Sequence, residues 1–260
     1  MHRPRKRFGQ HFLHDPGVIG RIVAAIAPQS QDRMVEIGPG LGALTLPLLE
    51  RLDELHAVEI DRDAIAHLRE VTLNDPRLHI HSADVLTFSF AHIYEQGGGR
   101  PLRLVGNLPY NISTPLLFHL IEQRQYILDM HFMLQKEVID RMAAAPGSEH
   151  YGRLTVMLAP WVRVEPLFDI GPGAFRPPPK VISTVARLTP HATPLDVGDA
   201  RQFTAVVAAA FSQRRKTLRN ALKPLLDAED IAAAGIDPGL RAEVLSPPQF
   251  VALGRRLASK

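Results

Sequence analysis

The sequence predicts an α/β protein with a doubly wound, mostly parallel sheet and a small all-helical C-terminal domain. Short apolar runs alternate with longer segments whose apolar residues recur at helical spacing, which is typical of β-α-β units. A glycine-rich turn, residues 38–42, joins the first run to its helix. After residue 195 the pattern is helical only. With 260 residues, the chain is long enough for one large domain and one small one.

The composition narrows the class of protein. Hydrophobic residues make up 45% of the chain and charged residues 22%, as in ordinary globular proteins. No apolar run is long enough to span a bilayer and no secretory signal is evident, so we expect a cytoplasmic protein with no membrane contact. Cysteine is absent, which excludes disulfides and thiolate catalysis, and the 12 histidines show no His-Glu-x-x-His pattern, so we expect no metal. Nothing in the sequence demands more than a monomer.

The first predicted strand, Met34 to Ile37, leads into Gly38-Pro39-Gly40-Leu41-Gly42. Gly38 and Gly40 have no Cβ to exclude a ligand and can adopt φ > 0, while the amides that open the next helix face the same space. The turn therefore suits a nucleotide or nucleoside, although a plain strand-to-helix turn has the same residues. Its Gly-x-Gly-x-Gly spacing is one residue shorter than the dinucleotide fingerprint, which disfavours NAD.

Two carboxylates follow the next two predicted strands. The predicted strand within residues 55–60 has Glu59 at its carboxyl end, about twenty residues after the glycine turn. At this position of a nucleotide-binding fold, a carboxylate accepts hydrogen bonds from ribose hydroxyls. The alternative is a solvated side chain. The strand over residues 78–81 leads to Asp84 at the carboxyl edge of the sheet. Asp84 can accept a hydrogen bond from a nucleobase amine there, or cap a turn.

The fourth predicted strand, Leu102 to Val105, runs into Gly106-Asn107-Leu108-Pro109-Tyr110. The adenine N6 amine is a poor nucleophile because its lone pair is delocalised into the ring. If the Asn107 side-chain oxygen and the Leu108 carbonyl accept its two N–H bonds, the nitrogen is held and its developing charge is stabilised. Tyr110 offers a ring for stacking on an unpaired base. We therefore expect Asn107, Leu108 and Tyr110 to be catalytic, although a lone Asn-x-Pro-Tyr segment is also a plain turn.

The remaining elements complete the sheet and the small domain. A strand over residues 130–134 and a helix over 136–145 precede two late strands, over residues 162–170 and 181–188, that are predicted to form an antiparallel hairpin. Phe175 lies between these strands in a turn rich in proline, where on sequence alone it anchors a loop. A linker over residues 189–194 separates a first domain, 1–190, from a helical domain, 195–260.

Basic side chains gather in two segments without acidic residues, although the formal net charge is only +3. The first is an N-terminal arm, residues 1–14, and the second lies between Ser212 and Lys223. Phosphate contacts supply most of the sequence-independent affinity for nucleic acid, so a polyanionic partner is predicted. Each segment alone is also compatible with a solvated surface. From the second segment we expect RNA contacts by Arg214, Arg215 and Lys216.

Together, these motifs resemble the ribosomal RNA adenine N6-dimethyltransferase family over nearly the whole chain. The resemblance is carried by seven segments: residues 8–13, 36–45, 59–61, 84, 107–110, 175–183 and 211–220. It implies a Rossmann-like class I methyltransferase fold, with S-adenosyl-L-methionine as cofactor and S-adenosyl-L-homocysteine as product. It also implies N6,N6-dimethylation of two adjacent adenosines near the 3′ end of 16S rRNA, in the assembling 30S subunit.

The resemblance also assigns roles to single residues. It implies that the cofactor is contacted by His11, Leu13, Gly38, Gly40, Glu59, Asp84 and Asn107. Glu59 would bind its ribose and Asp84 its adenine amine, and Asn107 would lie between cofactor and target. Tyr110 and Phe175 would hold the target base between their rings. Family members vary between histidine and asparagine at the position of His11.

Three alternatives stay open on the sequence. One is the 23S rRNA adenine N6-methyltransferase of the macrolide-resistance type, whose motifs overlap with these. The match over Ser212 to Asn220 favours the small-subunit enzyme. Another is a DNA adenine methyltransferase, which the lack of a separate base-reading domain disfavours. The third is a ribosome-assembly factor whose binding matters more than its catalysis, a role that can coexist with the enzymatic one.

Overall fold

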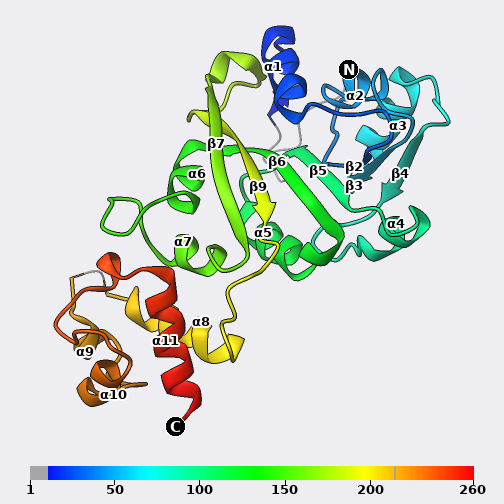
Figure 1. Ribbon diagram of the computed structural model, residues 1–260. Coiled ribbons are helices and arrows are strands. Elements are labelled where there is room, and N and C mark those ends of the chain that lie inside the picture. Colours follow the sequence, from blue (N-terminus) through cyan, green and yellow to red (C-terminus); the bar gives the residue numbers. More distant parts are fainter. Residues whose placement is uncertain (1–10, 214) are drawn as a thin grey trace. The chain divides into compact units, whose positions relative to one another are not determined.

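The computed structural model describes residues 11–213 and 215–260 (Figure 1). The chain forms two compact units. The first contains the residues up to Ile139 together with Val164–Pro190, and the second contains Asp140–Arg163 together with His191–Lys260. No helix among the described residues combines the length and the apolar character that crossing a membrane requires.

A seven-stranded sheet in the order β4-β3-β2-β5-β6-β9-β7 forms the centre of the first unit. Its strands are β2 (Arg33–Ile37), β3 (Leu55–Glu59), β4 (Leu78–Ser82), β5 (Leu102–Asn107), β6 (Ile127–Gln135), β7 (Val162–Ile170) and β9 (Ser183–Pro190). Strands β4, β3, β2, β5 and β6 are parallel, and β9 is antiparallel to β6. The strand order changes direction between β2 and β5, where open parallel sheets bind ligands. The predicted fold class is confirmed.

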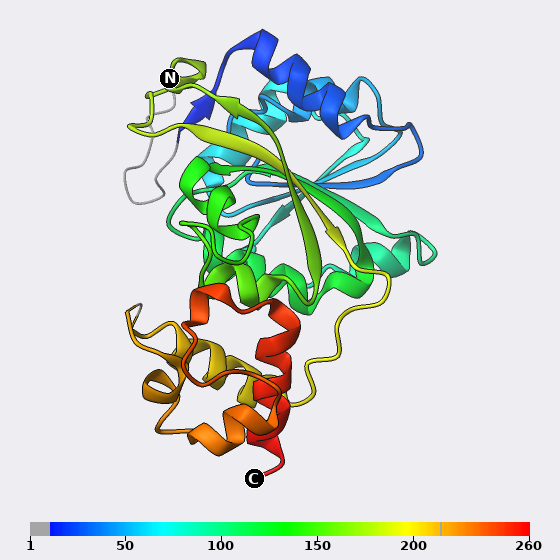
Figure 2. The same ribbon diagram turned by 60° about the vertical axis from the view of Figure 1, so that its left-hand side comes forward.

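Helices cover both faces of this sheet, with α1, α2 and α3 on one face and α4 and α5 on the other (Figure 2). Their bounds are α1 (Pro16–Ile26), α2 (Thr45–Leu49), α3 (Arg62–Val71), α4 (Ala91–Gln96) and α5 (Ser113–Glu122). Asp15 and Asp61 cap the N-termini of α1 and α3. Ser113 is the first residue of α5, and its hydroxyl donates to the Tyr110 carbonyl at 3.1 Å.

The second unit is helical and has a core of its own. Its helices include α7 (Arg153–Leu158), α8 (Ala200–Ala210), α9 (Leu218–Ala221), α10 (Ala228–Ala233) and α11 (Pro247–Ala258), while α6 (Lys136–Met142) spans the boundary between the units. Tyr151 and Val156 pack into the same core as Phe203 and Phe250. This packing draws residues 140–163 into the second unit. One change of unit falls between Pro190 and His191, at the start of the expected linker, whereas the sequence did not place residues 140–163 in the second unit. The functional domains 1–190 and 195–260 stay a prediction.

A two-stranded sheet, which the sequence did not predict, joins the start of the described chain to the turn before β9. Its strands are β1 (Phe12–Leu13) and β8 (Phe175–Arg176), which pair antiparallel. Phe12 lies opposite Arg176 and Leu13 opposite Phe175. Both Leu13 and Phe175 are buried in the core of the first unit. This pairing fixes residues 11–13 beside the sheet.

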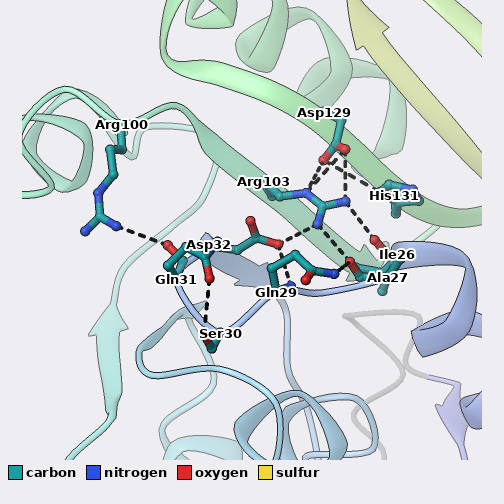
Figure 3. A network of polar contacts seen from close by, with 10 residues as sticks. All are labelled: Ile26, Ala27, Gln29, Ser30, Gln31, Asp32, Arg100, Arg103, Asp129 and His131. Carbon is teal, nitrogen blue, oxygen red and sulfur yellow. Dashed lines mark hydrogen bonds and ion pairs between the residues drawn. The ribbon is translucent and has the colours of Figure 1, made fainter.

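A network around Arg103 ties the amino-terminal ends of the strands together (Figure 3). The Arg103 guanidinium donates to Asp129 of β6 at 3.0 Å, to Asp32 at 2.6 Å and to the carbonyl of Ile26 at 2.7 Å. Its side chain is 12% exposed, so these ion pairs are largely shielded from water. The network holds β5 and β6 to the end of α1, and it leaves the carboxyl ends of the strands for the site.

Candidate functional site

A cavity opens at the carboxyl ends of β2, β3 and β5. Its empty volume is about 970 Å³ when open solvent at the mouth is included. Its lining comes from residues 11–13, the glycine turn after β2, residues 59–60 and residues 107–112. The predicted site residues that line it are His11, Leu13, Gly38, Gly40, Glu59, Asn107, Leu108 and Tyr110. The sheet topology has thus brought four separate sequence motifs together.

The glycine turn depends on backbone conformations that favour glycine. Gly38 has φ = 65° and Gly40 has φ = 54°, both in the left-handed region. A Cβ on Gly38 would meet nothing within 4 Å, so bare backbone faces open space there. A Cβ on Gly40 would lie 3.2 Å from the Phe12 ring. The turn is therefore open to a ligand at Gly38 and covered by β1 at Gly40.

Backbone amides hold the Glu59 carboxylate in place at the end of β3. Oε1 accepts from the amides of Ile60 and Asp61, each at 2.9 Å, and Oε2 accepts from the amide of Gly40 at 3.3 Å. Burial raises the pKa of Glu59, and these hydrogen bonds oppose the rise. Oε2 has only one long bond and can accept a second, so a hydroxyl in the cavity can donate to it.

Glu36 also lines the cavity, and the sequence reasoning did not select it as a site residue. It is 2% exposed, and Thr45 Oγ1 donates to its Oε2 at 2.6 Å. Burial, with the nearby charge of Glu59, raises the pKa of Glu36 from 4.5 to about 7. The sequence did contain a signal for Glu36, because this carboxylate interrupts the apolar run of a buried strand. Burying a charged side chain costs free energy, so a carboxylate at such a position indicates a functional role.

The turn after β5 is fixed from two sides. Asn107 Nδ2 donates to the carbonyl of His11 at 2.9 Å, and the amide of Leu108 donates to the carbonyl of Met133 at 3.1 Å. Because a carbonyl only accepts, the His11 contact leaves Asn107 Oδ1 as the end available to a donor. Leu108 is 1% exposed and also lines the cavity.

The Tyr110 ring lies between the arm and β9. Its hydroxyl is 3.1 Å from Ser183 Oγ, and its ring centroid is 5.6 Å from that of His11, at an interplanar angle of 30°. Burial raises the pKa of Tyr110, so the phenol is neutral at physiological pH. A neutral ring that lines an open cavity is suited to stacking on a planar ligand.

Two predicted site residues do not reach the cavity in this conformation. Asp84 is exposed, and its Oδ1 accepts from the amide of Leu86 at 2.9 Å, as in a capped turn. Phe175 is 3% exposed because its pairing with Leu13 turns the ring into the core. A ring buried in this way has no free face for a base. The roles of Asp84 and Phe175 stay predictions, and each requires a local rearrangement.

The predicted RNA contacts lie in the second unit. Arg215 and Lys216 are exposed in the segment between α8 and α9, while Arg214 lies outside the described residues. Their contacts with RNA stay a prediction. Within the part of the chain that the structure describes, no group of three or more histidine or carboxylate side chains is arranged to hold a metal ion.

The strand order and the glycine turn are those of a Rossmann-like fold, and similar solved structures identify the general class as a methyltransferase. A dimethyladenosine transferase from Plasmodium falciparum has a similar solved structure, with a TM-score of 0.80 and 25% identity, covering 94% of this chain and 96% of that one. The 23S rRNA methyltransferase ErmE superposes with a TM-score of 0.72 and 27% identity, covering 95% and 99%. The predicted enzyme class, a methyltransferase, is confirmed.

Sequence comparison identifies the family. The model of the ribosomal RNA adenine dimethylase family matches residues 1–259. The ribosomal RNA small subunit methyltransferase A of Methylococcus capsulatus is 57% identical over 256 residues, 98% of either chain. The protein of the same name from Thiobacillus denitrificans is 56% identical over 261 residues, the full length of both. The chain belongs to the ribosomal RNA adenine dimethylase family, as its motifs predicted.

Proposed function

We propose that this enzyme transfers methyl groups from S-adenosyl-L-methionine to the N6 atoms of two adjacent adenosines near the 3′ end of 16S rRNA. The reaction takes place in the cytoplasm, on the assembling 30S subunit. The observation that carries this proposal is that Asn107 and Tyr110 line one cavity together with the glycine turn, while Asn107 Nδ2 is engaged by the His11 carbonyl. Full-length relatives above 55% identity that are named small subunit methyltransferases support the choice of rRNA.

The residues of the cavity fit the cofactor. Gly38 leaves bare backbone toward open space, which suits the amino-acid part, and Glu59 Oε2 can accept from a ribose hydroxyl. His11 and Leu13 close the cavity from the arm. When bound there, S-adenosyl-L-methionine supplies a methyl group on a sulfonium, which is electrophilic without further activation.

The chain's own contribution to the transfer is to hold the target amine. Asn107 Oδ1 and the Leu108 carbonyl accept the two N–H bonds of adenine N6, which orients the nitrogen and stabilises its developing positive charge. Tyr110 stacks on the base. The methylated nitrogen carries a positive charge and releases one proton to water. Only one N–H bond then remains, so one of these acceptors is unpaired during the second transfer. The reaction proceeds by positioning, without a covalent enzyme intermediate.

The experiment that tests the proposal compares acceptors. Transfer of a labelled methyl group is measured in parallel onto small ribosomal subunits that lack the modification, large subunits and double-stranded DNA. We expect two methyl groups on each of two adjacent adenosines of 16S rRNA, and background levels on the other acceptors. Preferred methylation of large subunits would instead assign the chain to the 23S rRNA reaction, and preferred methylation of DNA would overturn the RNA assignment.

A further inference from the structure

The segment 11–14, called the strap below, is held at both ends to the turn that precedes β9. At one end, the amide of His14 donates to the carbonyl of Ala174 at 2.9 Å, and Leu13 is buried against Phe175. At the other end, His11 Nδ1 donates to the carbonyl of Pro177 at 2.8 Å. Between these ends the strap forms the paired strand β1. Its position is therefore set by backbone pairing and by one imidazole hydrogen bond.

His11 connects the strap to the turn after β5. Its backbone carbonyl accepts from Asn107 Nδ2 at 2.9 Å, and its ring lies 5.6 Å from the Tyr110 ring. The same residue thus contacts Pro177 through its side chain and Asn107 through its main chain. Loss of the imidazole contact would remove one of the two attachments of this end of the strap, which carries the carbonyl that Asn107 contacts.

The orientation of the Asn107 carboxamide matters because its two ends have opposite hydrogen-bonding roles. Oδ1 accepts, whereas Nδ2 donates, and the two ends have nearly the same shape. Turned by 180°, the carboxamide would present N–H groups to an amine whose own N–H bonds need acceptors. Within the site, the contact with the His11 carbonyl favours the productive orientation.

We propose that His11 is a positioning residue: its imidazole, by donating to the Pro177 carbonyl, holds the strap so that the His11 carbonyl orients Asn107 for the target amine. This inference rests on the proposed function. A cofactor contact of His11 would not require this role. Here the imidazole N–H has a partner within the protein, the Pro177 carbonyl, and its hydrogen bond affects the orientation of the Asn107 carboxamide.

A matched pair of variants isolates the imidazole N–H. His11→Asn keeps a donor, because Asn Nδ2 is the same number of bonds from Cα as His Nδ1. His11→Asp has the same shape as His11→Asn but only accepts at neutral pH, so it cannot donate to the Pro177 carbonyl. His14→Asp places the same charge on the neighbouring exposed residue of the strap and serves as the control. Thermal unfolding of each variant verifies that all measurements are made on folded protein.

The first measurement needs no RNA. The chain contains four asparagines, Asn74, Asn107, Asn111 and Asn220, so ¹⁵N-asparagine labelling gives a simple spectrum of side-chain amides. Loss of one signal pair in Asn107→Gln assigns Asn107. We expect its amide protons to exchange with water at least about threefold faster in His11→Asp than in the wild type, and at the wild-type rate in His11→Asn and His14→Asp. Equal exchange in all four proteins would overturn the proposal.

The second measurement separates positioning from cofactor binding. We expect His11→Asp to lower the single-turnover rate of methyl transfer about 10- to 100-fold, because small misplacements of a reacting group cost this much. Its affinity for S-adenosyl-L-homocysteine, measured by calorimetry, should change less than about threefold, and His11→Asn should restore the rate. A defect confined to affinity, or no rescue by His11→Asn, would contradict the inference. If wild-type protein did not methylate small subunits, the proposed function would fail while the amide exchange still tested the strap.

Discussion

At the scale of single residues, main-chain groups orient the polar side chains of the site. The Glu59 carboxylate accepts from three backbone amides, and the Asn107 carboxamide donates to the His11 carbonyl. These backbone groups lie just outside the ends of paired strands, which restrain them, so the side chains that they hold are already oriented before a ligand arrives. This arrangement reduces the reorganisation that the reaction requires.

Replacing Asn107 by alanine removes an acceptor for the target amine but leaves the glycine turn and Glu59 in place. We expect Asn107→Ala to slow the first methylation about 100-fold or more, the usual effect of losing one preorganised polar group. The affinity for S-adenosyl-L-homocysteine should change by less than about threefold. Single-turnover methyl transfer and calorimetry measure the two quantities. A variant that lost only cofactor binding would show that the role assigned to Asn107 is wrong.

Glu36 makes the stability of the folded protein depend on pH. Its pKa rises from 4.5 to about 7 on folding, so the folded protein holds this proton more tightly than the unfolded chain does. The associated stability is fully present below pH 4.5 and is lost as pH rises through 7, in total about 3 kcal/mol. We expect Glu36→Gln to lack this loss and to be more stable than the wild type at pH 8. Urea unfolding at pH 5 and pH 8 measures the difference, and the same decrease in both proteins would contradict the assignment.

At the scale of elements, the close approach of β5 to β2 places Asn107 beside the glycine turn. A Cβ on Gly106 would lie 2.5 Å from the carbonyl oxygen of Ile37, a distance that real Cβ contacts do not reach. Gly106 precedes Asn107, and Ile37 precedes Gly38. A displacement of either strand therefore reaches both halves of the site at once.

We expect Gly106→Ala to destabilise the protein by about 2 kcal/mol or more, because the new methyl group forces these strands apart. Cofactor affinity and methyl transfer should fall together. Gly20→Ala is the matched control: its Cβ would meet nothing within 4 Å, and alanine stabilises a helix by about 1 kcal/mol relative to glycine. Denaturant unfolding of both variants tests the contrast. A Gly106→Ala protein as stable as the wild type would disprove the steric argument.

His131 of β6 is buried, and burial lowers its pKa to about 4, although Asp129 opposes the shift. The folded protein keeps the ring neutral where the unfolded chain binds a proton, so stability is lost as pH falls below 6.5 toward 4. At pH 5 this loss amounts to about 2 kcal/mol. We expect His131→Leu, which has a similar volume, to lose less stability than the wild type between pH 7 and pH 5. Denaturant unfolding curves at these two pH values measure the losses of stability. Equal losses in the variant and the wild type would count against the assignment.

At the scale of the whole molecule, the two compact units separate the predicted tasks. The cavity lies in the first unit, and the exposed Arg215 and Lys216 lie in the second. The predicted roles therefore imply that substitutions in the first unit alter catalytic geometry and substitutions in the second alter RNA affinity, independently of each other. If an assembly role depends on RNA binding more than on catalysis, substitutions in the second unit should impair growth more than substitutions in the cavity do.

Replacing Arg214, Arg215 and Lys216 together by glutamine should weaken binding to 16S rRNA and make it less sensitive to salt. Three lost phosphate contacts lower the slope of log K against log salt concentration by about 2. The affinity for S-adenosyl-L-homocysteine should not change. Glutamine at Arg51 and Arg69, exposed in the first unit, is the control and should leave the slope unchanged. RNA-binding titrations at several salt concentrations measure this slope. An unaltered slope in the triple variant would refute the phosphate contacts.

The sequence alone determined the sheet and most of the segments that line the candidate cavity. Strand and helix periodicities are local, so the alternation of elements was readable from the chain. Because the carboxyl ends of parallel strands meet at one edge, the glycine turn, Glu59 and Asn107 to Tyr110 had to converge once the sheet was parallel. The motifs in this order also identified the family, which the comparisons confirm.

Only the tertiary structure decided the features that depend on distant pairing. Strands β1 and β8 have two residues each, too few for a periodicity, and the hydrogen bond between His11 and Pro177 joins residues 166 positions apart. The same pairing buries Phe175, and packing around Phe203 draws residues 140–163 into the second unit. These outcomes follow from competition for buried surface and hydrogen-bond partners among segments far apart in the chain, which no local pattern records.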